Sequence, residues 1–158
     1  IFSIAFHNAK HGVVAGGDYR KEKDAINNLA VTGDGGITWT LVKGLSGFRS
    51  VVAYVPNTNT LIALGPSGGD YSTDDGRTWN PITGPGFDTF SFVPRKPIGW
   101  ASGAQGSIAR LTFTKIKSVE KSASSATYLA SVLFATTFTS LPTVSLRFAA
   151  RCQLIPML

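Results

Sequence analysis

An eight-residue pattern that occurs twice, forty positions apart, constrains the fold of this chain more than any other feature. Residues 32–39 read TGDGGITW and residues 72–79 read STDDGRTW. Both copies place a hydroxyl first, an aspartate third, a glycine fifth and Thr-Trp at the end. An aspartate accepts hydrogen bonds from the backbone of its own turn, and a glycine takes the positive φ that closes a tight turn. β-Branched and aromatic residues then favour an outgoing strand.

The pattern predicts two hairpin turns with a structural role. In each copy the leading hydroxyl can add a second short-range hydrogen bond. The residues assigned to the two turns are Thr32, Asp34, Gly36, Thr38, Trp39, Ser72, Asp74, Gly76, Thr78 and Trp79. Each turn offers too few oxygens for calcium, which takes about six to eight, so no metal is predicted there.

A second repeated segment lies upstream of each octapeptide. Residues 6–17, 54–65 and 92–103 align without a gap and end on Gly17, Gly65 and Gly103. A first strand signal at residues 2–6, 50–54 and 90–93 leads into each segment, where a turn rich in Asn, Pro or Lys is followed by a second apolar strand signal. With the octapeptide, each unit provides four antiparallel strands in roughly 40–50 residues, a length typical of stacked repeat units. We therefore predict an all-β chain of consecutive four-stranded antiparallel sheets.

The repeat pattern stops near residue 111. The third unit lacks the octapeptide, all 17 glycines lie at or before Gly106, and residues 112–158 are rich in Ser and Thr. We predict repeat units over residues 1–111 and an atypical C-terminal extension over residues 112–158. The charge-free residues 122–146 leave three interpretations open: a folded or poorly ordered extension, a membrane anchor, or an artefact of the gene end. The only methionine is Met157, so we expect a fragment of a longer protein.

The two octapeptides resemble the Asp-box, or BNR repeat, of β-propellers such as sialidases, sortilin-type domains and photosystem II assembly-factor-like proteins. The resemblance covers residues 1–111 and implies a partial β-propeller of about two and a half blades. We expect it to be the C-terminal part of a larger ring, with the remaining blades supplied by a longer chain. In those families the Asp-box is a structural turn away from the ligand-binding face. The resemblance also implies an extracytoplasmic location, periplasmic or secreted.

For function, the resemblance implies a non-catalytic binding or assembly scaffold with a protein or glycan ligand. The alternative is a glycan-acting or glycan-binding propeller of the sialidase or glycoside hydrolase type. Such enzymes combine a tyrosine nucleophile, an acid and an arginine cluster, and no such set falls on equivalent strand positions here. A sortilin-like receptor is a third hypothesis. We predict no catalytic residue and no cofactor.

The first unit carries about eight extra residues, which include the charged stretch DYRKEKD at residues 18–24. A charge run of mixed sign is typical of a solvated surface loop. Insertions in repeat proteins also gather on one face, often the binding face. The second interpretation is therefore a ligand-contacting loop, with Tyr19 and Arg20 as its contact residues.

The net charge of +6 does not indicate nucleic-acid binding, because it is unevenly spread. Residues 1–111 hold ten Lys/Arg and eight Asp/Glu, a net charge of +2, whereas residues 112–158 hold five Lys/Arg and one Glu, a net charge of +4. His7 and His11 flank one turn, with no third ligand nearby in sequence for a metal. The single Cys152 excludes a multi-cysteine metal site.

Three tryptophans lie at strand-associated positions of the repeats. Aromatic residues in such positions usually belong to the core, where they bury a large apolar surface. We therefore expect Trp39, Trp79 and Trp100 to seal one sheet against the next. A sugar-stacking platform is the alternative.

Overall fold

The computed structural model describes residues 1–113, 131–134 and 149–154, which are all-β apart from one short 3₁₀ turn, η1 (Ala104–Gly106). The first sheet contains β1 (Ser3–Phe6), β2 (Gly12–Ala15), β3 (Leu29–Thr32) and β4 (Thr40–Leu41). The second contains β5 (Val51–Tyr54), β6 (Leu61–Gly65), β7 (Gly68–Ser72) and β8 (Asn80–Ile82). The third contains β9 (Thr89–Phe92), β10 (Ile98–Gly103) and β11 (Ser107–Thr112). These strands pair antiparallel in chain order, which confirms the predicted class and its consecutive antiparallel sheets.

Two further strands extend the third sheet. β13 (Ala149–Leu154) pairs antiparallel with β11, and β12 (Ser131–Phe134) pairs parallel with β13. β11 is therefore an interior strand of this sheet. The interpretations of residues 122–146 fall mostly outside the described residues. Within the described part of the chain, no helix has the length and apolar character needed to cross a membrane.

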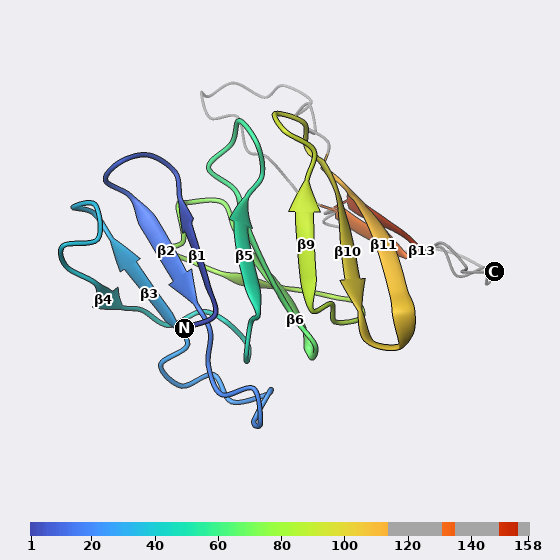
Figure 1. The fold of residues 1–158 in the computed structure, drawn as a ribbon, viewed down its shortest axis with the longest axis horizontal. Helices are drawn as coiled ribbons and strands as arrows, with labels where there is room; N and C mark the ends of the chain where they lie inside the picture. The colour runs from blue at the N-terminus through green and yellow to red at the C-terminus, as the bar shows by residue number, and fades with distance from the viewer. Residues whose placement is uncertain (114–130, 135–148, 155–158) are drawn as a thin grey trace, which may run out of the picture.

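The three sheets lie side by side, with their first strands β1, β5 and β9 as neighbours (Figure 1). The first core, between the first and second sheets, consists of Val13, Ala15, Leu29, Leu45, Val52, Leu61 and Ala63. The second core, between the second and third sheets, consists of Val55, Ile62, Leu64, Tyr71, Phe87, Phe90, Ala101, Ala109 and Leu111. Apolar burial of this kind is worth roughly 25 cal/mol per Å². Each sheet is thus held chiefly by burying a face against its neighbour.

Equivalent backbone hydrogen bonds show how the three units correspond. An amide at the start of each first strand donates to a carbonyl at the end of the second strand, at 2.9, 2.9 and 2.8 Å in the pairs Phe2–Ala15, Ser50–Leu64 and Asp88–Ser102. The residue after each carbonyl is a glycine. Gly16, and not Gly17, therefore corresponds to Gly65 and Gly103. The ungapped alignment is wrong by one residue in the first unit.

The length of one turn causes this shift. The turn over residues 7–11, closed by the His7 amide on the His11 carbonyl, is one residue shorter than the turn over residues 55–60. Because alternate residues of a strand face opposite sides of a sheet, a one-residue shift changes the face that each side chain takes. Val13 consequently enters the first core, whereas Val14 lies on the opposite face.

A buried ion pair links the first two sheets. Arg49 Nε donates to Asp70 Oδ2 at 2.7 Å, and the two side chains are 2% and 0% exposed. Ser46 Oγ donates to Asp70 Oδ1 at 2.8 Å and accepts from Arg49 Nη2 at 2.6 Å. Ser46 and Arg49 belong to the connection from β4 to β5, whereas Asp70 lies on β7. The network therefore fixes the connection between two sheets to the interior of the second.

Replacing Asp70 with alanine is expected to lower the free energy of unfolding by about 3–5 kcal/mol, because the Arg49 guanidinium would remain buried without its partner. Urea denaturation followed by circular dichroism measures this change. The matched control is Asp88→Ala, which removes an exposed aspartate. Equal losses in the two variants would show that the buried pair is not a specific stabilising contact.

Candidate functional site

The strand connections from β1 to β11 gather at two opposite ends of the sheets, because consecutive strands within each of these sheets pair antiparallel. The turn end carries residues 7–11, 33–39, 55–60, 73–79 and 93–97. The loop end carries residues 16–28, 42–50, 66–67, 83–88 and 104–106. In Figure 1 the long loop between β2 and β3 extends below the sheets, away from the β1–β2 turn. Both octapeptides lie at the turn end, and the charged loop lies at the loop end.

In the first octapeptide the Asp34 carboxylate is held within its own turn. It accepts hydrogen bonds from the Thr38 amide at 2.9 Å and from the Thr38 and Thr32 hydroxyls. Thr32 Oγ1 in turn accepts from the amide of Gly36, which has a φ of +90°. These hydrogen bonds, led by that of the Thr38 hydroxyl, lower the pKa of Asp34 from 3.8 to about 2.

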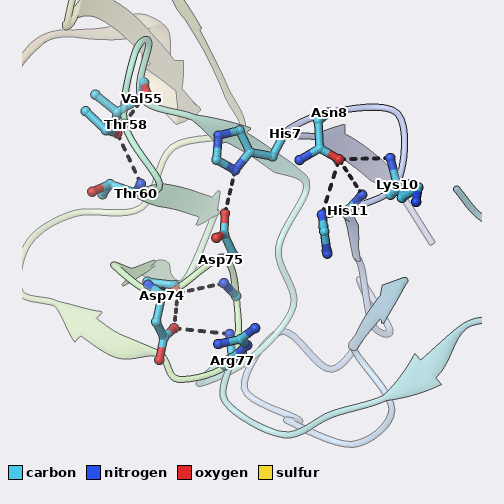
Figure 2. Close-up of polar contacts among 12 residues, drawn as sticks. His7, Asn8, Lys10, His11, Val55, Thr58, Thr60, Asp74, Asp75 and Arg77 are labelled. Carbon is cyan, nitrogen blue, oxygen red and sulfur yellow. Dashed lines mark hydrogen bonds and ion pairs between the residues drawn. The ribbon is translucent and has the colours of Figure 1, made fainter. Parts of the chain in front are cut away.

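The second octapeptide repeats this geometry. The Asp74 carboxylate accepts from the Thr78 amide at 2.9 Å and the Thr78 hydroxyl at 2.7 Å. It also accepts from the Arg77 amide at 3.1 Å (Figure 2). The Ser72 hydroxyl donates to Asp74 at 2.8 Å and accepts from the Gly76 amide at 2.9 Å. Burial acts to raise the pKa of Asp74, but the hydrogen bonds from Thr78, Ser72 and Arg77 outweigh it and lower the pKa. Both carboxylates are therefore engaged in shaping their turns.

The three tryptophans differ in their surroundings. Trp79 donates through Nε1 to the Gly76 carbonyl at 2.9 Å and packs against the first core. Trp39, at the same position of the first octapeptide, is 37% exposed, and Trp100 is 43% exposed. Within the described residues, only Trp79 packs between two sheets as predicted, whereas Trp39 and Trp100 are exposed. The difference arises because a sheet covers Trp79, whereas no described sheet covers Trp39 or Trp100.

The charged loop at the loop end is fixed by its backbone. The Glu22 carbonyl accepts from the Phe48 amide at 2.8 Å and from Ser67 Oγ at 3.0 Å. Within the loop, Asp18 Oδ1 accepts from the Arg20 amide at 2.9 Å, which is the local turn chemistry expected of aspartate. The loop therefore has a defined shape, tied to the connection between the first and second sheets.

Tyr19 and Arg20 project from this loop. Tyr19 is 55% exposed, and the Arg20 guanidinium lies 5.4 Å from the centroid of the Tyr19 ring. Arg20 Nε also donates to the Tyr19 hydroxyl at 3.2 Å. Residues 19–24 line a hollow of about 390 Å³. The structure thus brings the two predicted contact residues together as one exposed aromatic and cationic pair.

A polar contact that local sequence signals could not reveal joins the turn ends of the first two sheets (Figure 2). His7 Nδ1 lies 2.7 Å from Asp75 Oδ1, although the two residues are 68 positions apart. The His7 ring also lies 5.0 Å from the Tyr54 ring. Burial and then the Asp75 carboxylate raise the pKa of Tyr54 to about 12. The contact therefore links the β1–β2 turn to the second octapeptide.

His7 and His11 do not converge on a shared site. The Asn8 side-chain oxygen accepts from the amides of Lys10 and His11 at 2.9 and 3.0 Å, and lies 3.2 Å from His11 Nδ1 (Figure 2). His11 is thus directed into its own turn, whereas His7 contacts Asp75. Among the described residues, no group of three or more His, Cys, Asp or Glu side chains is arranged to hold a metal ion.

The chain matches no protein-family model and no curated protein. Its clearest functional feature is the contrast between its two ends. The octapeptide carboxylates at the turn end are occupied by hydrogen bonds within their turns. Tyr19 and Arg20 at the loop end instead extend into solvent from a backbone held in place. The loop end is therefore the candidate binding site.

Acidification is expected to weaken the first octapeptide turn through Asp34. Because its pKa in the folded chain, about 2, is below the ordinary value of 3.8, Asp34 contributes stability above about pH 4 that is lost as the pH falls towards 2. A carboxyl-carbon NMR titration measures this pKa directly. The Asp34→Asn variant lacks the titrating group and should show a shallower pH dependence of unfolding in this range. A measured pKa near 3.8 would contradict the hydrogen-bonded geometry.

Removing the second carboxylate by Asp74→Ala is expected to lower the free energy of unfolding by about 1–3 kcal/mol, because it leaves donors of the turn without their charged acceptor. Urea denaturation gives the value. Thr73→Ala is the matched control, since it changes the neighbouring exposed position that the octapeptide pattern leaves variable. A similar effect of both changes would argue against the structural role assigned to Asp74.

Proposed function

We propose that this chain is part of an Asp-box β-propeller that acts as a non-catalytic binding or assembly scaffold, with a protein ligand at the loop end. One observation carries this proposal: the two ends of the sheets are built differently. The turn end uses its carboxylates to hold its own backbone. The loop end holds its backbone through the Glu22 carbonyl and leaves the Tyr19 and Arg20 side chains exposed.

The arrangement of the sheets supports the propeller part of the proposal. Antiparallel sheets lie side by side with their first strands adjacent, as blades do around an axis (Figure 1). Both octapeptides connect the third strand of a sheet to its fourth, β3 to β4 and β7 to β8. Propellers close with about four to eight blades. The proposed scaffold therefore includes blades from a longer chain.

The composition of the loop end favours a protein ligand. Tyrosine and arginine are enriched among the residues that contribute most to protein–protein affinity. The charges of the loop are balanced between Asp18, Glu22 and Asp24 on one side and Arg20, Lys21 and Lys23 on the other. A polyanion such as nucleic acid is bound by an excess of positive charge. The balanced loop fits a mixed protein surface better.

A glycan-acting or glycan-binding propeller of the sialidase type is the second candidate. The observation in its favour is that Tyr19, Arg20 and Glu22 line the same hollow. These are the residue types that such enzymes use as nucleophile, carboxylate-binding cation and acid. We rank it second because Arg20 already covers the Tyr19 ring and bonds its hydroxyl.

A photo-cross-linking amino acid at Lys21 provides the test, followed by affinity measurements with the captured protein. Replacing Tyr19 and Arg20 together with alanine is expected to weaken binding by roughly thirtyfold or more, because such interface residues often contribute about 2 kcal/mol. Isothermal titration calorimetry measures the affinities of the variant and the parent chain.

The matched control is Ile37→Ala, which changes an exposed residue of the first octapeptide at the turn end. It should leave the affinity unchanged. If Ile37→Ala weakened binding and the double loop variant did not, the binding site would be at the turn end, and the proposal would be wrong. Hydrolysis of a sialoside by the chain, lost on Tyr19→Phe, would establish the second candidate instead.

A further inference from the structure

The first sheet leaves one apolar face uncovered. This face, which we call the outer face, consists of the exposed Ile4, Phe6, Trp39 and Leu41 around the buried Val14 and Ala30. Ile4 and Leu41 are 56% and 63% exposed. Several of these residues, together with Ile1 and Phe2, line a hollow of about 800 Å³. A contiguous patch of large apolar side chains, unlike a single exposed one, marks an interaction surface.

The strand register shows which residues of the second sheet occupy the positions equivalent to the outer face. The cross-strand row Ile4–Val14–Ala30–Leu41 of the first sheet corresponds to the row Val52–Ala63–Asp70–Pro81 of the second. Val14 and its equivalent Ala63 are both buried, whereas Ile4 is 56% exposed and its equivalent Val52, which packs in the first core, is 3% exposed. Trp39 corresponds to Trp79, which packs against the first core. The outer face therefore resembles the face of the second sheet that packs against the first sheet, but no described sheet packs against it.

We propose that the outer face is a docking surface for another four-stranded antiparallel sheet of the same kind. The occupant needs a near face of small and branched apolar residues, like the face with which the first sheet covers Val52. In the first sheet that face is formed by Ala5, Val13, Ala15, Leu29 and Val31. The proposal deepens the propeller part of the proposed function, on which it rests, and it is independent of any ligand at the loop end.

The far side of the third sheet does not match this chemistry, which argues against a second copy docking head to tail. Its central cross-strand row is Ser91–Trp100–Arg110, where the first sheet has Ala5–Val13–Val31. Trp100 and Arg110 are exposed there. Packing this row on the outer face would bury a guanidinium against apolar side chains, which is costly without a partner. The occupant is therefore a sheet with an apolar near face.

One position distinguishes this junction from the junction between the first and second sheets. The hydrogen bond from the Phe2 amide shows that Ile1 corresponds to Arg49, and the register shows that Ala30 corresponds to Asp70. The buried ion pair is thus replaced by two apolar residues. The occupant consequently needs no hydroxyl equivalent to Ser46 to satisfy a buried charge.

The test fuses a copy of residues 1–48 to the N-terminus of the complete chain. Because Ile1 corresponds to Arg49, this fusion reproduces the connection that joins the first sheet to the second. Ser46 of the added copy is changed to alanine. Docking should slow the amide hydrogen exchange of β1 and β4 in the original first sheet by roughly tenfold or more. Tryptophan fluorescence should also report that Trp39 of the original chain becomes shielded from acrylamide. The parent chain without the added copy is the reference.

Ile4→Lys in the original first sheet is the matched control, because Ile4 is exposed in the parent chain. The change should leave the parent chain's exchange unaltered and abolish the added protection in the fusion. Unchanged exchange of β1 and β4 in the fusion would overturn the proposal, and so would an added copy that stays unprotected, since docking is what would fold it. A parent chain that dimerises, and becomes monomeric on Ile4→Lys, would assign the face to a second copy instead.

Discussion

Burial of one sheet against the next is the interaction on which the rest of this structure depends. Small and branched side chains of the first sheet fit against Val52, Leu61 and Ala63 of the second, and larger ones fill the second core. Because strand residues alternate between two faces, this packing fixes the register of every strand. It also separates the connections into a turn end and a loop end, and so decides which residues can meet.

The best-connected polar side chains of this fold hold its turns and connections in place. The Asp34 and Asp74 carboxylates hold tight turns, and those hydrogen bonds keep both groups ionised at lower pH than usual. The Arg49–Asp70 pair holds the connection between sheets in a buried setting, where a charge without a partner would be costly. The carboxylates of Asp34, Asp74 and Asp75 at the turn end are thus all engaged in contacts within the protein. The proposed recognition site is at the loop end.

The two proposals concern different surfaces and have different physical origins. Recognition at the loop end relies on Tyr19 and Arg20, which are exposed on a fixed backbone. Docking on the outer face relies on apolar area, at the same positions that are buried in the second sheet. The polar row around Trp100 on the third sheet shows that the two ends of the stack are not alike. The described stack of sheets therefore has an apolar face at its first sheet and a more polar face at its third sheet.

The sequence by itself determined the β class, the consecutive antiparallel sheets and the positions of the two octapeptides, because those features depend on alternation and on contacts within a few residues. Only the tertiary structure decided the rest. The one-residue shift of Gly16 depends on the length of a turn, and the Arg49–Asp70 and His7–Asp75 contacts join residues 21 and 68 positions apart. Trp39 and Trp79 share one local pattern, yet a neighbouring sheet covers Trp79, and no described sheet covers Trp39. The burial of a side chain depends on the sheet packed against it, and a pattern of eight residues carries no information about that sheet.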